Sequence, residues 1–133
     1  MAAQWRLANP RPGTVGCVAL DERGGLASST STGGTGQSYP GRVGDTPIIG
    51  AGTYCTSQVG VSMTGVGERI MVLLSAKRLC DLVAEGQPVE AAAGRVLGEL
   101  GQAPAGLIAL DASGTMVEKL NTPFMPTVRR GGA

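Results

Sequence analysis

The residues best suited to chemistry in this sequence are Gly13 and Thr14, which stand directly before a short apolar run. A threonine hydroxyl is a poor nucleophile until a base removes its proton. The sequence contains no histidine, which excludes an imidazole base supplied by this chain. The remaining base is the α-amino group of Thr14, which is free only after the bond to Gly13 is cut. Taken alone, these residues favour a plainer interpretation, in which Thr14 begins a strand.

A second group of candidates lies in a glycine-rich loop, where Arg42 and Asp45 are three residues apart. A guanidinium can bind a carboxylate through two hydrogen bonds, and an aspartate can accept from an ammonium. The pair therefore suits an amino-acid head group, which carries both charges. The alternative is a surface ion pair that contributes about 0 to 1 kcal/mol.

A third candidate is the turn containing Gly65 and Gly67, which stands between a predicted strand and a predicted helix. Glycines at such a turn let the backbone approach a ligand closely. A dinucleotide-binding turn would need Gly or Ala at position 70, where this chain has Ile70. The dinucleotide interpretation is therefore disfavoured.

Turn residues and apolar periodicity predict the elements that position these candidates. Residues 21–25 predict the turn of a hairpin that begins next to Thr14, and residues 32–52 predict a long loop. Two apolar stripes at helical spacing predict helices that pack on a sheet. We expect strands over 15–20, 26–31 and 60–64, helices over 68–85 and from Pro88 to residue 100, and strands over 106–110 and 115–120. This order favours an α+β protein.

Composition limits the classes of function. A chain of 133 residues is long enough for one domain, and its net charge of +1 lacks the basic stripe of a nucleic-acid-binding protein. No apolar run reaches membrane-spanning length and residues 1–13 lack a signal sequence, so we expect a cytoplasmic protein with no membrane partner. Three widely spaced cysteines predict neither disulfides nor a zinc site.

Several separated blocks of the sequence resemble the plant-type L-asparaginase and isoaspartyl aminopeptidase family of N-terminal-nucleophile hydrolases. The blocks, in chain order, are 13–16 with 18–21, 30–34, 40–47 with 50–52, 62–68 and the late strand 106–108. Among related families, glycosylasparaginases usually have Asp before the nucleophile and Asn where Gly33 stands. Threonine aspartases depart at residues 45–47. Gly13, Gly33 and Asp45 together favour the asparaginase and isoaspartyl branch.

The resemblance implies catalytic roles for five residues. Thr14 matches the nucleophile, which is released by its own attack on the preceding peptide bond, so Gly13 and Thr14 form the autocleavage site. Thr32 matches a second threonine whose hydroxyl tunes the nucleophile. Thr64 and Gly65 match the oxyanion donors.

The resemblance also implies a substrate site. Arg42 and Asp45 match the residues that hold the α-carboxylate and α-ammonium of the substrate, and Gly65 and Gly67 complete this site. Gly67 would contact the substrate amino group through its carbonyl. No metal or organic cofactor is implied for this chain.

The family fold is a four-layer αββα sandwich, and this chain resembles its C-terminal half, the β-subunit. We accordingly expect a leader over 1–13 from the α-subunit side, the β-subunit over 14–127 and a flexible tail over 128–133. The expected partners are the α-subunit portion, in an (αβ)2 assembly, and a small-molecule substrate. The implied function is hydrolysis of the side-chain amide of L-asparagine, the isopeptide bond of β-aspartyl dipeptides, or both. The alternative is an uncleaved, inactive half-domain that acts as a binding or interaction module.

Overall fold

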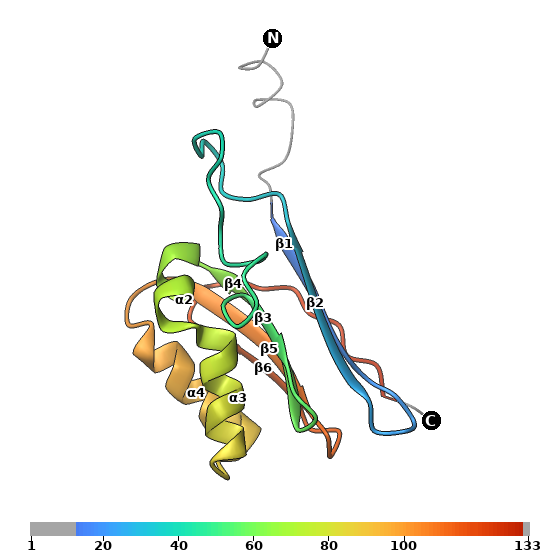
Figure 1. The fold of residues 1–133 in the computed structure, drawn as a ribbon. Coiled ribbons are helices and arrows are strands. Elements are labelled where there is room, and N and C mark those ends of the chain that lie inside the picture. The colour runs from blue at the N-terminus through green and yellow to red at the C-terminus, as the bar shows by residue number, and fades with distance from the viewer. Residues whose placement is uncertain (1–12, 132–133) are drawn as a thin grey trace.

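A computed structural model describes residues 13–131 (Figure 1). The predicted leader over 1–13 lies outside these residues except for Gly13, and so do the last two residues of the predicted tail. The elements are β1 (Thr14–Leu20), β2 (Leu26–Thr32), β3 (Thr53–Cys55), β4 (Val59–Gly65), α2 (Gly67–Leu73), α3 (Ser75–Ala84), α4 (Val89–Glu99), β5 (Ala105–Asp111) and β6 (Met116–Leu120).

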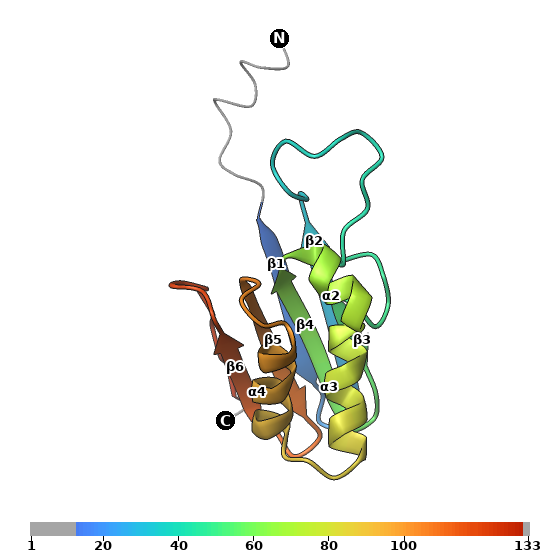
Figure 2. The same cartoon turned by 90° about the vertical axis from the view of Figure 1, so that its left-hand side faces the viewer.

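The described elements form three layers. Strands β3, β4, β5 and β6 make a four-stranded antiparallel sheet in that order, and β1 pairs with β2 in a separate antiparallel hairpin. Helices α3 and α4 cover one face of the four-stranded sheet, and the hairpin lies against the other face (Figures 1 and 2). The described chain is therefore an α+β protein, as the sequence predicts.

Strand β4 has two faces of different chemistry. Its odd-numbered residues Val59, Val61 and Met63 are buried in the apolar core with the helices. Burial of one such side chain contributes about 1.5 to 3 kcal/mol. The even-numbered Gly60 and Ser62 face the hairpin instead. Strand β4 therefore presents small and polar residues to the hairpin and apolar residues to the helices.

Two glycines allow the two sheets to approach closely. A Cβ added at Gly60 would lie 2.7 Å from Cγ1 of Val18, and one added at Gly16 would lie 2.8 Å from Cβ of Ser62 and collide with its hydroxyl. Val18 thus faces Gly60 and Gly16 faces Ser62, so the residue numbers fall along β1 as they rise along β4. Strand β1 therefore runs antiparallel over β4. This course brings the start of β1 to the end of β4.

The single helix predicted over 68–85 is wrong, because the chain forms α2 and α3 with a break at Leu74. Leu74 has φ 45° and ψ 52°, a left-handed conformation that costs a non-glycine residue about 1 to 2 kcal/mol. The break lets the loop that precedes β3 cap the first turn of α3. The amides of Ala76 and Lys77 donate to the carbonyls of Ala51 and Gly50, at 3.0 and 2.8 Å. Apolar periodicity does not reveal such a cap.

The other predicted helix and strand bounds lie within one residue of those observed. Pro88 caps the start of α4, and Gly101, with φ 66°, follows its last turn. The sequence indicated no element at β3, whose three residues are too few to show a strand pattern.

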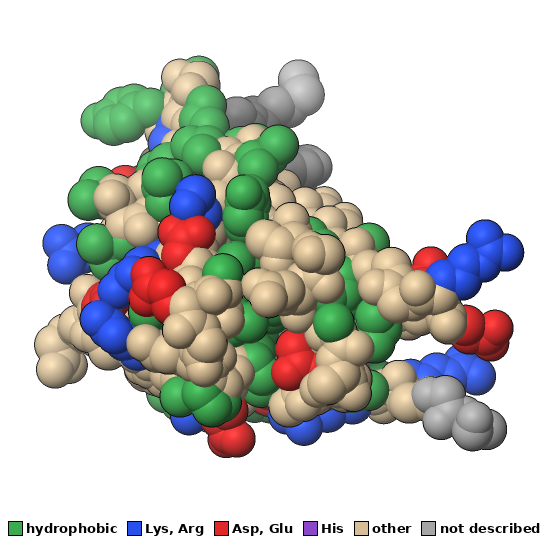
Figure 3. Space-filling view, turned by 60° about the horizontal axis from the view of Figure 1, so that its bottom comes forward, with side chains coloured by type: hydrophobic (Ala, Val, Ile, Leu, Met, Phe, Trp, Pro, Cys, Tyr) green, Lys and Arg blue, Asp and Glu red, His purple; other side chains and the backbone are tan. Residues whose placement is uncertain are grey.

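Within residues 13–131, no helix combines the length and apolarity needed to cross a membrane. On the face shown in Figure 3, acidic and basic side chains lie beside one another rather than in a block of one sign.

Candidate functional site

The site begins where the hairpin places two threonines opposite each other. Thr14 and Thr32 are cross-strand partners at the open end of the hairpin, and their Oγ1 atoms are 3.1 Å apart. The amide of Gly34 donates to Oγ1 of Thr32 at 3.0 Å. The Thr32 hydroxyl can still donate its proton to Thr14 or accept one from it. The predicted nucleophile and its predicted tuning residue are therefore in hydrogen-bond contact.

The backbone pairing extends one residue beyond Thr14. The amide of Gly33 donates to the carbonyl oxygen of Gly13 at 3.2 Å, which is the carbonyl of the predicted scissile bond. The sequence analysis gave the Gly33 backbone no role. The signal was available, since Gly33 directly follows Thr32 in a hairpin whose register begins at Thr14.

The predicted oxyanion donors lie at the end of β4. Val18 lies against Gly60, and Gly16 lies against Ser62. Two residues further along the same antiparallel course, Thr14 comes to the level of Thr64. Gly65 has φ 149°, and a Cβ there would collide with the carbonyl oxygen of Pro104 and lie 2.7 Å from Cα of Ala105. Only glycine fits that position. Thr64 and Gly65 are therefore at the same end of the two sheets as the threonine pair.

The carboxylate of Asp45 is enclosed between two glycines. A Cβ added at Gly52 would lie 2.7 Å from Oδ2, and one added at Gly67 would lie 2.7 Å from Oδ1. Asp45 is only 8% exposed, and burial raises its pKa while Arg42 opposes the rise. Among residues 13–131, Oδ2 has no hydrogen-bond donor. A buried acceptor left unsatisfied costs about 1 to 3 kcal/mol.

Arg42 also lies beside Gly67, and its guanidinium pairs with Glu68, a partner that the sequence did not reveal. A Cβ at Gly67 would lie 3.1 Å from Nη2 of Arg42. Nε and Nη2 of Arg42 both donate to Oε1 of Glu68, at 3.1 and 2.7 Å. This hydrogen bonding holds the pKa of Glu68 below its ordinary value. Glu68 directly follows Gly67 in the first turn of α2, a place where acidic residues are favoured.

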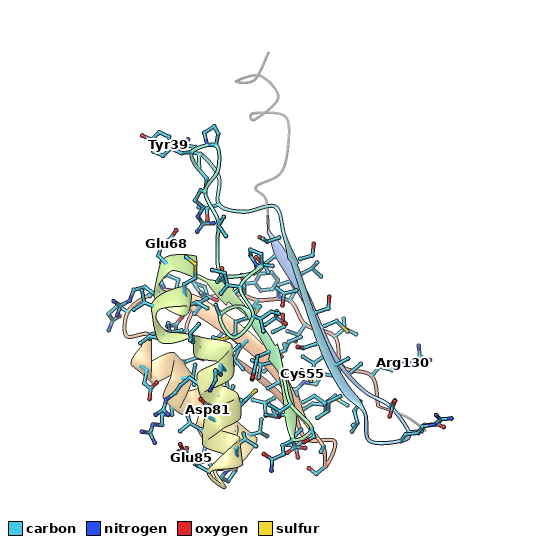
Figure 4. The ribbon with its side chains drawn as sticks, in the orientation of Figure 1. Tyr39, Cys55, Glu68, Asp81, Glu85 and Arg130 are labelled. Atoms are coloured by element: carbon cyan, nitrogen blue, oxygen red, sulfur yellow. The ribbon has the colours of Figure 1, made fainter. Side chains whose placement is uncertain are left out.

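These groups lie at one end of the molecule. In Figure 1 the start of β1, the end of β2 and the start of α2 are all near the loop that follows β2. Figure 4 places Glu68 at the end of α2 nearest that loop, whose labelled residue is Tyr39. A cavity of about 450 Å³ lies elsewhere, between the far part of β1, strands β5 and β6 and the C-terminal segment 127–131.

The fold and site define an α+β protein in which a strand-terminal threonine pair lies at the same end as a buried carboxylate. The family described as asparaginase matches residues 2–131, and the chain belongs to this family. The resemblance found in the sequence is thus confirmed at the level of the family.

Individual relatives agree with this assignment. The chain is 42% identical to the isoaspartyl peptidase/L-asparaginase of Bos taurus over 118 residues, which cover 86% of this chain and 38% of that protein. It is 44% identical to the plant-type L-asparaginase of Pyrobaculum calidifontis over 117 residues, covering 84% and 39%. It is 44% identical to the isoaspartyl peptidase of Escherichia coli over 120 residues, covering 85% and 37%. The chain therefore spans less than two fifths of these curated relatives.

Proposed function

We propose that this chain is the nucleophile-bearing part of an amidohydrolase that acts on L-asparagine, on β-aspartyl dipeptides, or on both. The observation that supports the proposal best is the contact between the hydroxyls of Thr14 and Thr32 in a member of the asparaginase family. Thr14 directly follows Gly13, as the proposed cleavage requires. The relatives reported above are named for isoaspartyl peptidase and L-asparaginase activities. We extend these substrate classes to this chain on that basis.

In the proposed maturation step, Oγ1 of Thr14 attacks the carbonyl carbon of Gly13. The peptide C–N bond breaks, the hydroxyl proton passes to the released amine, and an ester forms between Gly13 and the Thr14 oxygen. Water then hydrolyses the ester, which leaves a carboxylate on Gly13 and a free α-amine on Thr14. The Gly33 amide is placed to stabilise the negative charge that develops on the Gly13 oxygen.

In the proposed turnover, the α-amine of Thr14 takes the proton from its own hydroxyl. An α-amine has a reference pKa of about 7.7 to 8, so a substantial fraction is neutral near pH 7.5. Oγ1 attacks the side-chain amide carbon of the substrate, and Thr64 and Gly65 serve as donors to the oxyanion. The leaving amine or ammonia departs with the proton, and water hydrolyses the β-aspartyl ester. No metal or organic cofactor takes part in these steps.

The charged residues would hold the amino-acid head group. A substrate ammonium would donate to Oδ1 of Asp45, the carboxylate oxygen that lies beside Gly67 and Arg42. Arg42 would bind the α-carboxylate, which would compete with Glu68 for the guanidinium. Both side chains lie against Gly67, and a contact of its carbonyl with the ammonium is what the family resemblance implies. The buried, unpaired carboxylate is the feature that a surface ion pair does not explain.

We further propose that the chain forms part of a four-layer αββα sandwich, with residues 14–127 as its β-subunit. Three layers are made by the described elements, and the outer face of the hairpin is left uncovered, with Val15 70% exposed. An α-subunit portion would supply the fourth layer and further strands, in an (αβ)2 assembly. We retain residues 128–133 as a flexible tail and a cytoplasmic location as predictions.

The deciding experiment follows maturation and turnover together. The chain is co-expressed with the α-subunit portion of a relative, its intact mass is recorded, and release of ammonia or aspartate is measured with L-asparagine and with a β-aspartyl dipeptide. We expect a species that begins at Thr14, and turnover of at least one substrate. Ser57→Ala is the control, because Ser57 is an exposed hydroxyl in the turn between β3 and β4, away from the hairpin face that the α-subunit portion would cover. A full-length, inactive chain would favour the binding module instead.

A further inference from the structure

A second hydroxyl pair joins the two sheets one row behind Thr14 and Thr32. Oγ1 of Thr30, on β2, is 2.7 Å from Oγ of Ser62, on β4. Ser62 is 4% exposed, and its side chain occupies the space that a Cβ at Gly16 would fill. Gly16 is the cross-strand partner of Thr30. No pattern in the sequence indicates a role for this pair.

The pair connects the three parts of the candidate site. Thr30 is two residues before Thr32 on β2, and Ser62 is two residues before Thr64 on β4. Oγ1 of Thr30 also donates to the carbonyl of Gly52 at 3.4 Å, and the amide of Gly52 donates to the carbonyl of Asp45 at 3.1 Å. One small cluster therefore contacts the nucleophile strand, the strand of the oxyanion donors and the loop of the carboxylate.

We propose that the hydrogen bond between Thr30 and Ser62 positions the Thr14 and Thr32 hydroxyls against the end of β4. The expected effect of this bond on catalysis rests on the proposed function. The expected effect on the positions of Thr14 and Thr32 rests only on the geometry of the two sheets. The two residues are positioning residues, because the bond that they make lies behind the reacting hydroxyls.

The packing at the threonine end of the hairpin explains why one bond has this effect. Within residues 13–131 the hairpin pairs with no strand of the four-stranded sheet. At the end near Thr14 and Thr32 the layer between them contains Gly16 and the hydroxyls of Thr30 and Ser62, whereas the apolar Val18 packs on Gly60 farther from that end. Rotation or sliding of the hairpin would move Thr14 relative to Thr64. A misplacement of about 1 Å can lower a rate by about 100-fold. Gly52 is held independently by the amide of Met63 at 2.8 Å, so the Asp45 region should move less.

The molecule contains a matched control for this claim. Oγ of Ser28 is 3.1 Å from Oγ1 of Thr53 and donates to the carbonyl of Tyr54 at 3.0 Å. This is also a half-buried hydroxyl link between the hairpin and the four-stranded sheet. Ser28 is two residues further from Thr32 along β2, at the level of Val18. If the bond between Thr30 and Ser62 only held the two sheets together, removing it and removing the Ser28 link should have similar effects.

The test compares Thr30→Val, Thr30→Ser and Ser28→Ala in the processed protein with its α-subunit portion. We expect Thr30→Val to lower kcat at least tenfold with KM changed less than about threefold, whereas Thr30→Ser and Ser28→Ala stay within about threefold of wild-type kcat. Threonine methyl NMR of the unprocessed chain supplies a second readout. Thr30→Val should shift the Thr14 and Thr32 methyl signals, and Ser28→Ala should leave both signals in place.

The outcomes separate this inference from the proposed function. Wild-type kcat in Thr30→Val, or equal losses in Thr30→Val and Ser28→Ala, would overturn the positioning role. If the wild-type protein hydrolyses neither substrate, the proposed function fails, while the methyl shifts still support or refute the structural part. Thermal unfolding checks that each variant folds. Should Thr30→Val fail to fold, Ser62→Ala removes the same bond from the β4 side, and the same results are expected.

Discussion

The candidate site contains two regions of opposite character. The threonine pair is neutral, half-buried or exposed, and held on two paired strands, whereas Arg42 and Asp45 are charged and lie on the loop between β2 and β3. The strand region satisfies its hydroxyls internally, through the contact between Thr14 and Thr32 and the bond that the Gly34 amide donates to Thr32. In the loop region, one carboxylate oxygen of Asp45 has no donor among the residues that the structure describes. This difference suggests that the strands perform chemistry and the loop recognises substrate.

If the regions divide the work in this way, substitutions on the strands should lower kcat and substitutions on the loop should raise KM. The largest effect is expected at Thr14. Thr14→Ala removes the nucleophile and should abolish both cleavage after Gly13 and hydrolysis, a loss of at least about 10⁴-fold in kcat. Intact mass and a substrate assay measure both. Thr14→Ser keeps a hydroxyl and should keep detectable turnover, and activity retained by Thr14→Ala would contradict the mechanism.

A smaller loss of kcat is expected at Thr32. Thr32→Val keeps the shape of the side chain but removes the hydroxyl that contacts Thr14, so kcat should fall by about 100-fold. Steady-state kinetics on the processed protein measure kcat and KM separately. Thr32→Ser restores the hydroxyl and serves as the control. A change confined to KM in Thr32→Val would place Thr32 in substrate recognition and remove the contrast between the two regions.

On the loop, Asp45→Asn should raise KM by about 10 to 100-fold, with a smaller change in kcat. The variant loses the charged acceptor for the substrate ammonium, and a hydrogen bond to a charged group contributes about 1.5 to 3 kcal/mol. Substrate titrations measure the change. In the wild-type protein KM should also rise as pH falls through the raised pKa of Asp45, because protonation removes the same acceptor. A KM independent of pH across this range would argue against ammonium binding by Asp45.

The same carboxylate predicts a pH-dependent cost in stability. Burial raises the pKa of Asp45 in the folded state above its value in the unfolded chain. Folding is therefore disfavoured once pH rises above the unfolded value, and the cost is complete above the folded pKa. Asp45→Asn should stabilise the substrate-free protein by about 1 kcal/mol near pH 7, with the gain disappearing in acid. Urea unfolding at several pH values measures this difference, and a gain independent of pH would contradict the explanation.

The smallest effect is expected at Glu68, whose side chain is 62% exposed. Surface ion pairs contribute about 0 to 1 kcal/mol, so Glu68→Gln should change stability little. It should also free Arg42 for the substrate carboxylate and lower KM by about threefold or less. Glu99→Gln is a matched control, since Glu99 forms ion pairs with Arg78 and Arg95 on α3 and α4. A rise in KM in Glu68→Gln would mean that Glu68 orients Arg42 for binding instead of competing with substrate.

Sequence analysis predicted the features that depend on local chemistry. The turn residues 21–25 and the flanking β-compatible runs were enough to predict the hairpin, and its register brings Thr14 opposite Thr32. Pro88 and Gly101 marked the limits of α4 because each has a strong preference at a helix end.

Features that depend on tertiary contacts were missed. The break at Leu74 depends on carbonyls of Gly50 and Ala51, more than 20 residues away along the chain. The bond between Thr30 and Ser62 depends on how two sheets pack, which neither strand pattern specifies. Glu68 lies beside Gly67 in the sequence, but only the fold shows that it pairs with Arg42.

The central claim is that Thr14 works as a newly exposed N-terminal residue. The most direct measurement is the intact mass of this chain after co-expression with an α-subunit portion of a relative. We expect two fragments, one of which begins at Thr14, and a single uncut chain in the Thr14→Ala variant. A wild-type chain that stays uncut and still hydrolyses either substrate would contradict the account, because Thr14 would then have no free amine to act as its base.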